Sequence, residues 1–287
     1  MAAFSLAEVT DRETWRRRAP RLHVEDEAFQ RMAKPLAVEP ARVISARENL
    51  LLDGYVQESG IVFNVDLALM AEAVRGLSSE GLSPVFAFLY DEFWLPYCQL
   101  DTLFRELIGS TYAMLPDFWI WNVDPKKGEA GWAPHRDKGS ATLRADGMPN
   151  SITAWIPLTE ATPLNGCMYI VPARLDPTYG TNREGEWRFE LPSIRALPAK
   201  PGDVLIWNQA VLHWGARSAP QGRESRVAMA IEFQRGDVPP INPPLLKPCV
   251  LLPFEQRLKL IARQVLQYRH MYKVAPDLEQ MMLKLVG

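Results

Sequence analysis

The sequence predicts a mainly β fold, an antiparallel barrel or sandwich, with helices before and after it in the chain. From residue 118 onward, six short runs rich in Trp, Ile, Val and Thr follow one another, each bounded by Pro, Gly, Asn or Asp. Outside this region, apolar residues recur at the three- and four-residue spacing of amphipathic helices. Hydrophobic residues make up 47% of the 287 residues, enough to bury a sizeable core.

Residues 1–115 are expected to be mostly helix and loop. The segment 65–77 places its apolar side chains on one helical stripe, with Asn64 as a candidate N-cap, and the segment 98–115 repeats the pattern. The apolar and aromatic segment 83–94 fits either a strand or part of a helix. We therefore expect this N-terminal part to pack as helices beside the β region.

Residues 116–236 are expected to form the barrel core. The predicted strands are FWIWNV (118–123), SITAWIPL (151–158), CMYIV (167–171), DVLIWN (203–208), AVLHW (210–214) and RVAMAIEFQ (226–234). Asn165-Gly166 is a strong hairpin-turn dipeptide, and Pro201-Gly202-Asp203 fits a turn into the next strand. Short strands joined by such turns favour antiparallel pairing.

Residues 237–287 complete one predicted domain that spans 1–287. The proline-rich segment 237–248 is expected to be an extended connector, because consecutive prolines continue neither a helix nor a sheet. A helix follows, with one apolar face that comprises Phe254, Leu258, Ile261, Val265, Tyr268 and Tyr272. Its other face is predicted to carry Arg257, Lys259, Arg263 and Arg269. We expect this helix to pack on the outside of the sheet; membrane-surface binding and dimerisation are the alternatives.

Charge and cysteine content bear on partners and compartment. A formal net charge of -2 predicts no attraction to nucleic acid or to anionic membranes. The three cysteines, Cys98, Cys167 and Cys249, are widely spaced and form no CxxC pair, which favours a reducing compartment. The sequence contains no run of about 18 apolar residues, so we expect no membrane span. We therefore expect a cytoplasmic protein that is a monomer or a homodimer.

Two of the four histidines lie in the predicted β region and suggest a metal site. In His135-Arg136-Asp137, the first and third side chains of an extended chain point to the same side, so an imidazole and a carboxylate can reach one ion. His213 lies on a later predicted strand. Two histidines and one carboxylate leave three of six octahedral positions open, which is the arrangement of non-haem Fe(II) oxygenases. We predict that His135, Asp137 and His213 hold the metal.

A buried cation is predicted on the last strand of the core. Alternation in 226–234 places Arg226 and Glu232 on one face with two alanines between them, and larger apolar residues on the other face. A guanidinium that faces the interior needs an anionic partner, and its planar fork matches a carboxylate. That partner is either a bound acid or an internal Asp or Glu. Arg223, in the preceding turn, is the alternative to Arg226.

At these residues the chain resembles the phytanoyl-CoA dioxygenase family of Fe(II)/2-oxoglutarate oxygenases. The shared features, in order, are the strand that bears Asn122, the PHRD motif (134–137), the block 153–172, the GDVLIWN strand that leads to His213, and a final strand that begins with arginine. The match covers about 118–234, with a looser one at 53–62. The resemblance implies a double-stranded β-helix (jelly-roll or cupin-like) barrel with flanking helices.

The resemblance also implies the cofactors and site residues. His135, Asp137 and His213 would bind Fe(II), Arg226 would bind the distal carboxylate of the cosubstrate 2-oxoglutarate, and O2 would be the oxidant, with ascorbate as a reductant. Asn122 would make a polar contact near the cosubstrate, and Thr153 or Trp155 would line the same pocket. No separate general base is assigned.

The activity implied is a dioxygenase reaction that hydroxylates an unactivated C–H bond of a small organic or biosynthetic substrate, with release of succinate and CO2. Desaturation and ring formation are alternative outcomes, and the substrate is either free or bound to a carrier or coenzyme A. The family's usual PGSH-like turn is replaced here by residues 172–175, so no relative's substrate is carried over. Other classes left open are a cupin-like metal enzyme without 2-oxoglutarate and a non-catalytic ligand-binding barrel.

Overall fold

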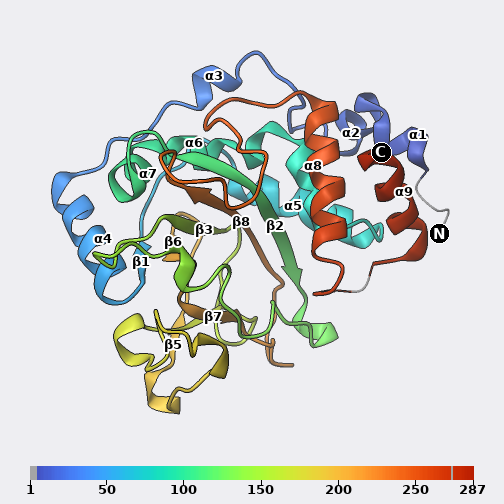
Figure 1. The fold of residues 1–287 in the computed structure, drawn as a ribbon. Coiled ribbons are helices and arrows are strands. Elements are labelled where there is room, and N and C mark those ends of the chain that lie inside the picture. The colour runs from blue at the N-terminus through green and yellow to red at the C-terminus, as the bar shows by residue number, and fades with distance from the viewer. Residues whose placement is uncertain (1–4, 273) are drawn as a thin grey trace.

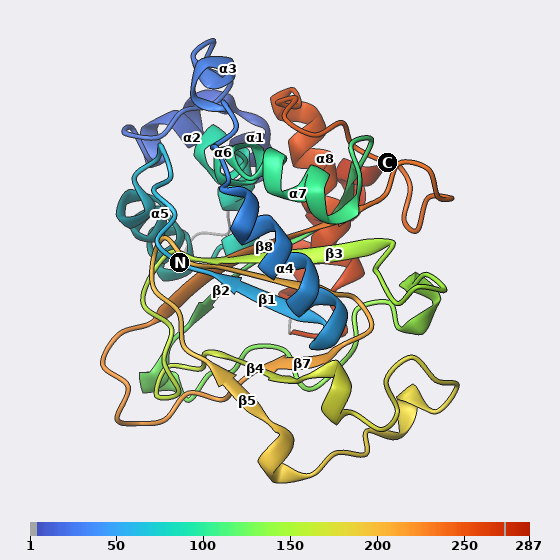
Figure 2. The same cartoon turned by 90° about the vertical axis from the view of Figure 1, so that its left-hand side faces the viewer.

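The computed structural model describes residues 5–272 and 274–287 and shows helices packed against one face of a β-sheet, with a smaller sheet on its other side (Figures 1 and 2). The strands are β1 (Tyr55–Glu58), β2 (Ala113–Val123), β3 (Ser151–Pro157), β4 (Met168–Val171), β5 (Arg195–Leu197), β6 (Val204–Asn208), β7 (Leu212–Gly215) and β8 (Arg226–Gln234). The larger sheet has the order β1-β6-β3-β8-β2 and the smaller one β5-β4-β7. Neighbouring strands are antiparallel throughout.

The helices come mostly from the two ends of the chain. They are α1 (Leu6–Thr10), α2 (Arg12–Arg18), α3 (Phe29–Met32), α4 (Pro40–Leu52), α5 (Leu67–Ser79), α6 (Leu95–Gln99), α7 (Asp101–Ile108), α8 (Phe254–Gln267) and α9 (Pro276–Val286). Figures 1 and 2 show that they gather on the side of the larger sheet that faces away from β4, β5 and β7.

The two faces of the larger sheet belong to two apolar cores. On β8, Val227 and Met229 pack into the core shared with the helices. Ala228 and Ala230 pack into a smaller core between the two sheets, to which Trp155 of β3 and Met168 of β4 also belong. Because successive strand residues point to opposite faces, the alternation predicted for 226–234 is confirmed. The small alanines leave space between the sheets, where the candidate site lies.

The predicted fold class, a mainly β protein of the double-stranded β-helix type with flanking helices, is confirmed. The strands form two separate sheets, so the barrel is not closed by a continuous ladder among the described residues. Each of the six predicted strands overlaps an observed one. The strands β1 and β5 were not predicted, because four and three residues are too few for a periodic signal.

Details of the N-terminal helices differ from the prediction. The N-cap of α5 is Asp66, whose carboxylate accepts a hydrogen bond from the Leu69 amide, so the assignment of Asn64 as the cap is wrong. The predicted helix 98–115 is divided into α6 and α7, and Gly109 ends α7 with φ +98°, a conformation that glycine adopts without steric cost. β2 then begins at Ala113, inside the segment predicted as helix. The prediction missed this start because a change from helical to strand periodicity within one apolar segment is difficult to locate from sequence.

The segment 83–94 forms neither a strand nor an α-helix. It folds into two 3-10 helices, η1 (Pro84–Leu89) and η2 (Asp91–Phe93). η1 packs between the helices α5 and α8 and the strand β2, and η2 contacts α6. Most of its side chains are fully buried, so no one-sided pattern exists that would indicate either period.

The C-terminal helix packs on the sheet as predicted, with one correction. α8 contacts β2 and η1 and buries the predicted apolar stripe as far as Val265. Arg257, expected on the solvent-facing side, is instead fully buried and donates to Asp91 at 2.8 Å and to the Leu89 carbonyl at 2.7 Å. The helical pattern places Arg257 on the polar face, but the buried carboxylate of Asp91, from a distant segment, provides a partner that lets this arginine be buried. In the described part of the chain, no helix is both long and apolar enough to cross a bilayer.

Candidate metal centre

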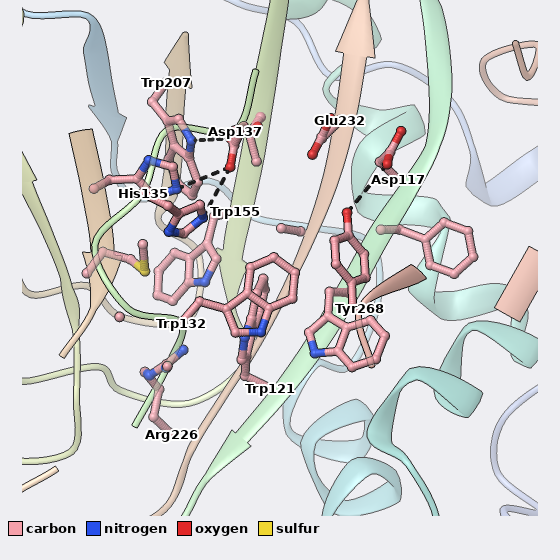
Figure 3. A pocket seen from close by; sticks show the side chains of 18 residues that line it. Asp117, Trp121, Trp132, His135, Asp137, Trp155, Trp207, Arg226, Glu232 and Tyr268 are labelled. Carbon is pink, nitrogen blue, oxygen red and sulfur yellow. Dashed lines mark hydrogen bonds and ion pairs between the residues drawn. The ribbon is translucent and has the colours of Figure 1, made fainter. Parts of the chain in front are cut away.

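His135, Asp137 and His213 come together at one point between the sheets (Figure 3). His213 is on β7, and His135 lies in the connection between β2 and β3. The two residues pair through their backbones, each amide donating to the other's carbonyl at 3.0 Å. The intervening Arg136 points elsewhere and forms an ion pair with Asp176 at 2.6 Å, as the His-x-Asp pattern predicts for the middle residue.

The orientation of the three side chains suits a metal ion. The Nε2 atoms of His135 and His213 lie 3.3 and 3.5 Å from Oδ1 of Asp137. Their Nδ1 atoms face backbone carbonyls, at 2.7 Å for Ala133 and 3.2 Å for Val211. Because each Nδ1 then carries the proton, each Nε2 presents a lone pair toward the carboxylate. All three ligand atoms lie within 4.8 Å of one another, which fits one small cation.

The electrostatic environment keeps His213 and Asp137 in the protonation states that a metal requires. Burial lowers the pKa of His213 to about 4, so this imidazole is neutral at pH 7. Burial alone would raise the pKa of Asp137, but the two imidazoles and a hydroxyl hold it well below its usual range. The site therefore presents a neutral imidazole beside an ionised carboxylate, the donor set that binds Fe(II) in two-His-one-carboxylate sites.

Two further side chains orient Asp137. Its Oδ2 accepts hydrogen bonds from Thr153 Oγ1 at 2.7 Å and from Trp207 Nε1 at 2.9 Å. These bonds turn the other oxygen, Oδ1, toward the histidines. Thr153 lines the predicted pocket, but its hydrogen bond goes to a triad residue. Trp207 was expected only as one of several aromatic residues near the pocket, and its hydrogen bond to Asp137 was not predicted.

Beside the triad lies a cavity that Trp155 and Arg226 also line, with about 490 Å³ of space not filled by atoms when the part open to solvent is included. Arg226 is 1% exposed, and its Nε and Nη1 have no hydrogen-bond partner among the residues that the structure describes. Burial lowers its pKa to about 10. Its guanidinium carbon lies 5.8 Å from the centre of the Trp155 ring, and Trp155 Nε1 is also buried with no hydrogen-bond partner in the described ranges 5–272 and 274–287. Arg223, the alternative cation, is exposed. The cavity thus offers unpaired donors to an anion.

Two glycines make room for the guanidinium. A Cβ built on Gly131 would lie 2.6 Å from the Gly215 Cα and 3.1 Å from Nη2 of Arg226. Any larger residue at position 131 would therefore displace the backbone of β7 or the arginine. The sequence alone did not indicate this close contact.

Asn122 lies outside this cavity. It lines a neighbouring groove, together with Ser78 of α5 and Leu278 of α9. Trp119 and Trp121 of the same strand line the cavity, so alternation along β2 places Asn122 on the other side. The expected polar contact between Asn122 and a cosubstrate receives no support from this placement. Tyr268, just after α8, also lines the cavity and was predicted only as a packing residue.

The two antiparallel sheets hold two histidines and one aspartate around one point, beside a buried arginine. This combination of fold and site defines the class of non-haem iron enzymes that depend on 2-oxoglutarate. The sequence profile of the phytanoyl-CoA dioxygenase (PhyH) family matches residues 70–225, more than half of the chain. The chain belongs to this family. No protein among the curated sequences matches it.

Solved structures show the same fold at low sequence identity. The epimerase SnoN, in complex with Fe3+, alpha-ketoglutarate and nogalamycin RO, has a TM-score of 0.54 and 19% identity over 75% of this chain and 96% of its own. AviO1 from Streptomyces viridochromogenes Tue57 has a TM-score of 0.53 and 18% identity over 71% of this chain and 99% of its own. The non-haem monooxygenase ThoJ has a TM-score of 0.53 and 14% identity over 84% of this chain and 98% of its own.

Proposed function

We propose that the protein is an Fe(II)- and 2-oxoglutarate-dependent oxygenase that hydroxylates an unactivated C–H bond of a small organic substrate. The observation that carries the proposal is the meeting of His135, Asp137 and His213 in one cavity with the unpaired guanidinium of Arg226. A metal triad alone fits many reactions, whereas a buried cation that lacks a protein partner requires an anionic co-reactant. Membership of the PhyH family supports the same assignment.

The residues have distinct roles in this proposal. His135 and His213 would hold iron through Nε2 and Asp137 through Oδ1, while Thr153 and Trp207 keep the carboxylate in position. Bound there, iron with 2-oxoglutarate and O2 supplies the oxidising power, and the cosubstrate leaves as succinate and CO2. No side chain is needed as a general base.

Arg226 orients the cosubstrate in this proposal. Its free Nε and Nη1 would donate hydrogen bonds to the distal carboxylate, and the unpaired Nε1 of Trp155 would offer another donor. The aromatic residues around the cavity exclude water, which strengthens these hydrogen bonds. Asp137 fills the carboxylate position of the triad, so the position that a halide would need is occupied and hydroxylation is favoured over halogenation.

Iron binding and cosubstrate turnover test the proposal. Anaerobically reconstituted protein should bind one equivalent of iron, and His135→Ala should lose it, as measured by plasma mass spectrometry. With 2-oxoglutarate and O2 the wild type should form succinate, and N-oxalylglycine should inhibit that reaction. Unchanged iron content in His135→Ala would favour a non-catalytic barrel. Iron binding without succinate formation or N-oxalylglycine inhibition would favour a metal enzyme that does not use 2-oxoglutarate.

The fate of O2 separates hydroxylation from other outcomes. Under ¹⁸O2, hydroxylation places one labelled oxygen in the product and the other in succinate. Desaturation, ring formation and epimerisation label succinate alone. Mass spectrometry of both products, once a substrate is found, therefore decides between these reactions.

A further inference from the structure

A polar cluster lies at the edge of the same cavity but takes no part in the proposed chemistry. It consists of Asp117 of β2, Glu232 of β8 and Lys138, which follows the His-x-Asp motif. Asp117 and Glu232 line the cavity, and Figure 3 shows Glu232 on the side of Asp137, with the Tyr268 hydroxyl directed toward Asp117. Glu232 pairs across the sheet with Thr153, the residue that holds Asp137. The cluster is therefore next to the metal triad.

The cluster and Arg226 occupy opposite ends of one strand face. Glu232 lies six positions after Arg226 on β8, which corresponds to roughly 20 Å along an extended chain. A dicarboxylate cosubstrate is attracted to the guanidinium and repelled by the carboxylates. The cosubstrate is therefore expected near Arg226, and Glu232 remains available for a contact with the substrate.

The charges in the cluster are incompletely balanced. Lys138 Nζ lies 3.3 Å from Glu232 Oε2 and 3.6 Å from Asp117 Oδ1, so two carboxylates share one ammonium group. Asp117 is otherwise satisfied, because Asn242 and Gln267 donate to it at 2.8 and 2.7 Å. Only Glu232 retains an unfilled position.

Glu232 keeps one oxygen free. Its Oε2 also accepts from Gln209 Nε2 at 2.6 Å, whereas Oε1 has no hydrogen-bond partner in the described part of the chain. The residue is only 7% exposed, and burial together with the neighbouring carboxylates raises its pKa well above the ordinary value. A buried carboxylate with an open acceptor is stabilised most by a cation that donates a hydrogen bond.

The aromatic wall of the cavity fits the same kind of ligand. The ring centres of Trp132 and Tyr268 lie 4.6 Å apart, and those of Trp121 and Trp132 lie 5.1 Å apart. Such rings bury an apolar body and attract a cation to their faces.

We propose that the substrate carries a protonated primary or secondary amine, which donates to Oε1 of Glu232, on an apolar or aromatic body that packs against Trp121, Trp132 and Tyr268. This inference rests on the proposed function, because it places the amine next to the carbon that is oxidised. Lys138, which lies near both carboxylates, holds Glu232 in position and lowers the cost of burying its charge.

Calorimetry with matched ligand pairs tests the inference on protein reconstituted anaerobically with Fe(II) and 2-oxoglutarate. The pairs are 2-phenylethylamine with 2-phenylethanol, tryptamine with tryptophol, and octylamine with octanol. A charge-assisted hydrogen bond predicts that the amine binds about tenfold to a hundredfold more tightly than its alcohol in at least one pair. Glu232→Gln, which keeps the shape, should abolish that preference, and Glu232→Asp should weaken it. The exposed control Glu190→Gln should retain it.

The outcomes separate this inference from the proposed function. Equal binding of amine and alcohol in every pair, or no binding of any amine, overturns the inference, as does a preference that survives in Glu232→Gln. The same calorimeter measures 2-oxoglutarate binding, which Glu232→Gln should leave unchanged. Absence of 2-oxoglutarate binding in the wild type refutes the proposed function by itself, whatever the amine result.

Discussion

Replacement of Arg226 by methionine should move two measured quantities in opposite directions. Burial lowers the pKa of Arg226 from 12.5 to about 10. Since one pKa unit corresponds to about 1.4 kcal/mol, the buried cation destabilises the ligand-free fold at pH 7 by about 3 kcal/mol. Because the pKa of this basic group is lower in the folded state, folding disfavours its charged form. The resulting loss of stability is relieved only as the pH rises through about 10.

Arg226→Met removes that cost and also removes the donors that face the cavity. We expect the ligand-free variant to be about 1–3 kcal/mol more stable than the wild type, because an apolar side chain replaces an unpaired buried charge. Its affinity for 2-oxoglutarate should fall at least about a hundredfold, as two charge-assisted hydrogen bonds contribute about 3 kcal/mol or more. Urea unfolding without ligand and calorimetry with Fe(II) and 2-oxoglutarate measure the two effects.

Arg223→Met is the matched control, since this arginine is exposed three residues earlier. It should change neither quantity. A ligand-free Arg226→Met that unfolds more easily than the wild type, while binding 2-oxoglutarate equally well, would refute the reasoning.

Three further predictions concern other contacts. Thr153→Val removes the 2.7 Å donor to Asp137 and should weaken iron binding about tenfold in a chelator competition; unchanged affinity would contradict the positioning role. Asp91→Asn leaves Arg257 buried without a counter-ion and should cost about 3–5 kcal/mol in urea unfolding, and a cost below about 1 kcal/mol would show that the pair is dispensable. The hydrogen bond to Glu92 raises the pKa of His23, so its stabilisation is complete below the unfolded pKa of about 6.5 and lost as the pH rises through the folded value. Accordingly, His23→Gln should lower the melting temperature at about pH 5.5 more than at about pH 9, and an equal effect at both would argue against this linkage.

The strand periods and the metal triad were predictable because local rules govern them. Alternation within a single strand already separates Arg226 and Glu232 from the apolar face, and the His-x-Asp spacing brings an imidazole and a carboxylate to one side. The third ligand, His213, was recognised from its place after a turn and a strand. No long-range information was needed for these steps.

The environment of the site depended on contacts between distant segments and was not predictable in the same way. Trp207 holds Asp137 across 70 residues of sequence, and Tyr268 reaches the cavity from beyond the end of a helix. The helical pattern predicts that Arg257 faces solvent, and only the ion pair with the distant Asp91 explains its burial. The expected contact of Asn122 with a cosubstrate came from the family resemblance, whereas alternation along β2 places this side chain in the neighbouring groove.

The reciprocal backbone pair between His135 and His213 has a consequence for dynamics. No strand is described between β2 and β3, so this pair is one of the attachments of that long connection to β7. An ion shared by the two side chains would act as a clasp across the same two residues and would slow local opening of the loop. Amide hydrogen exchange at positions 135 and 213 should therefore become slower with metal and faster with a chelator, which provides a measure of occupancy that requires no knowledge of the substrate.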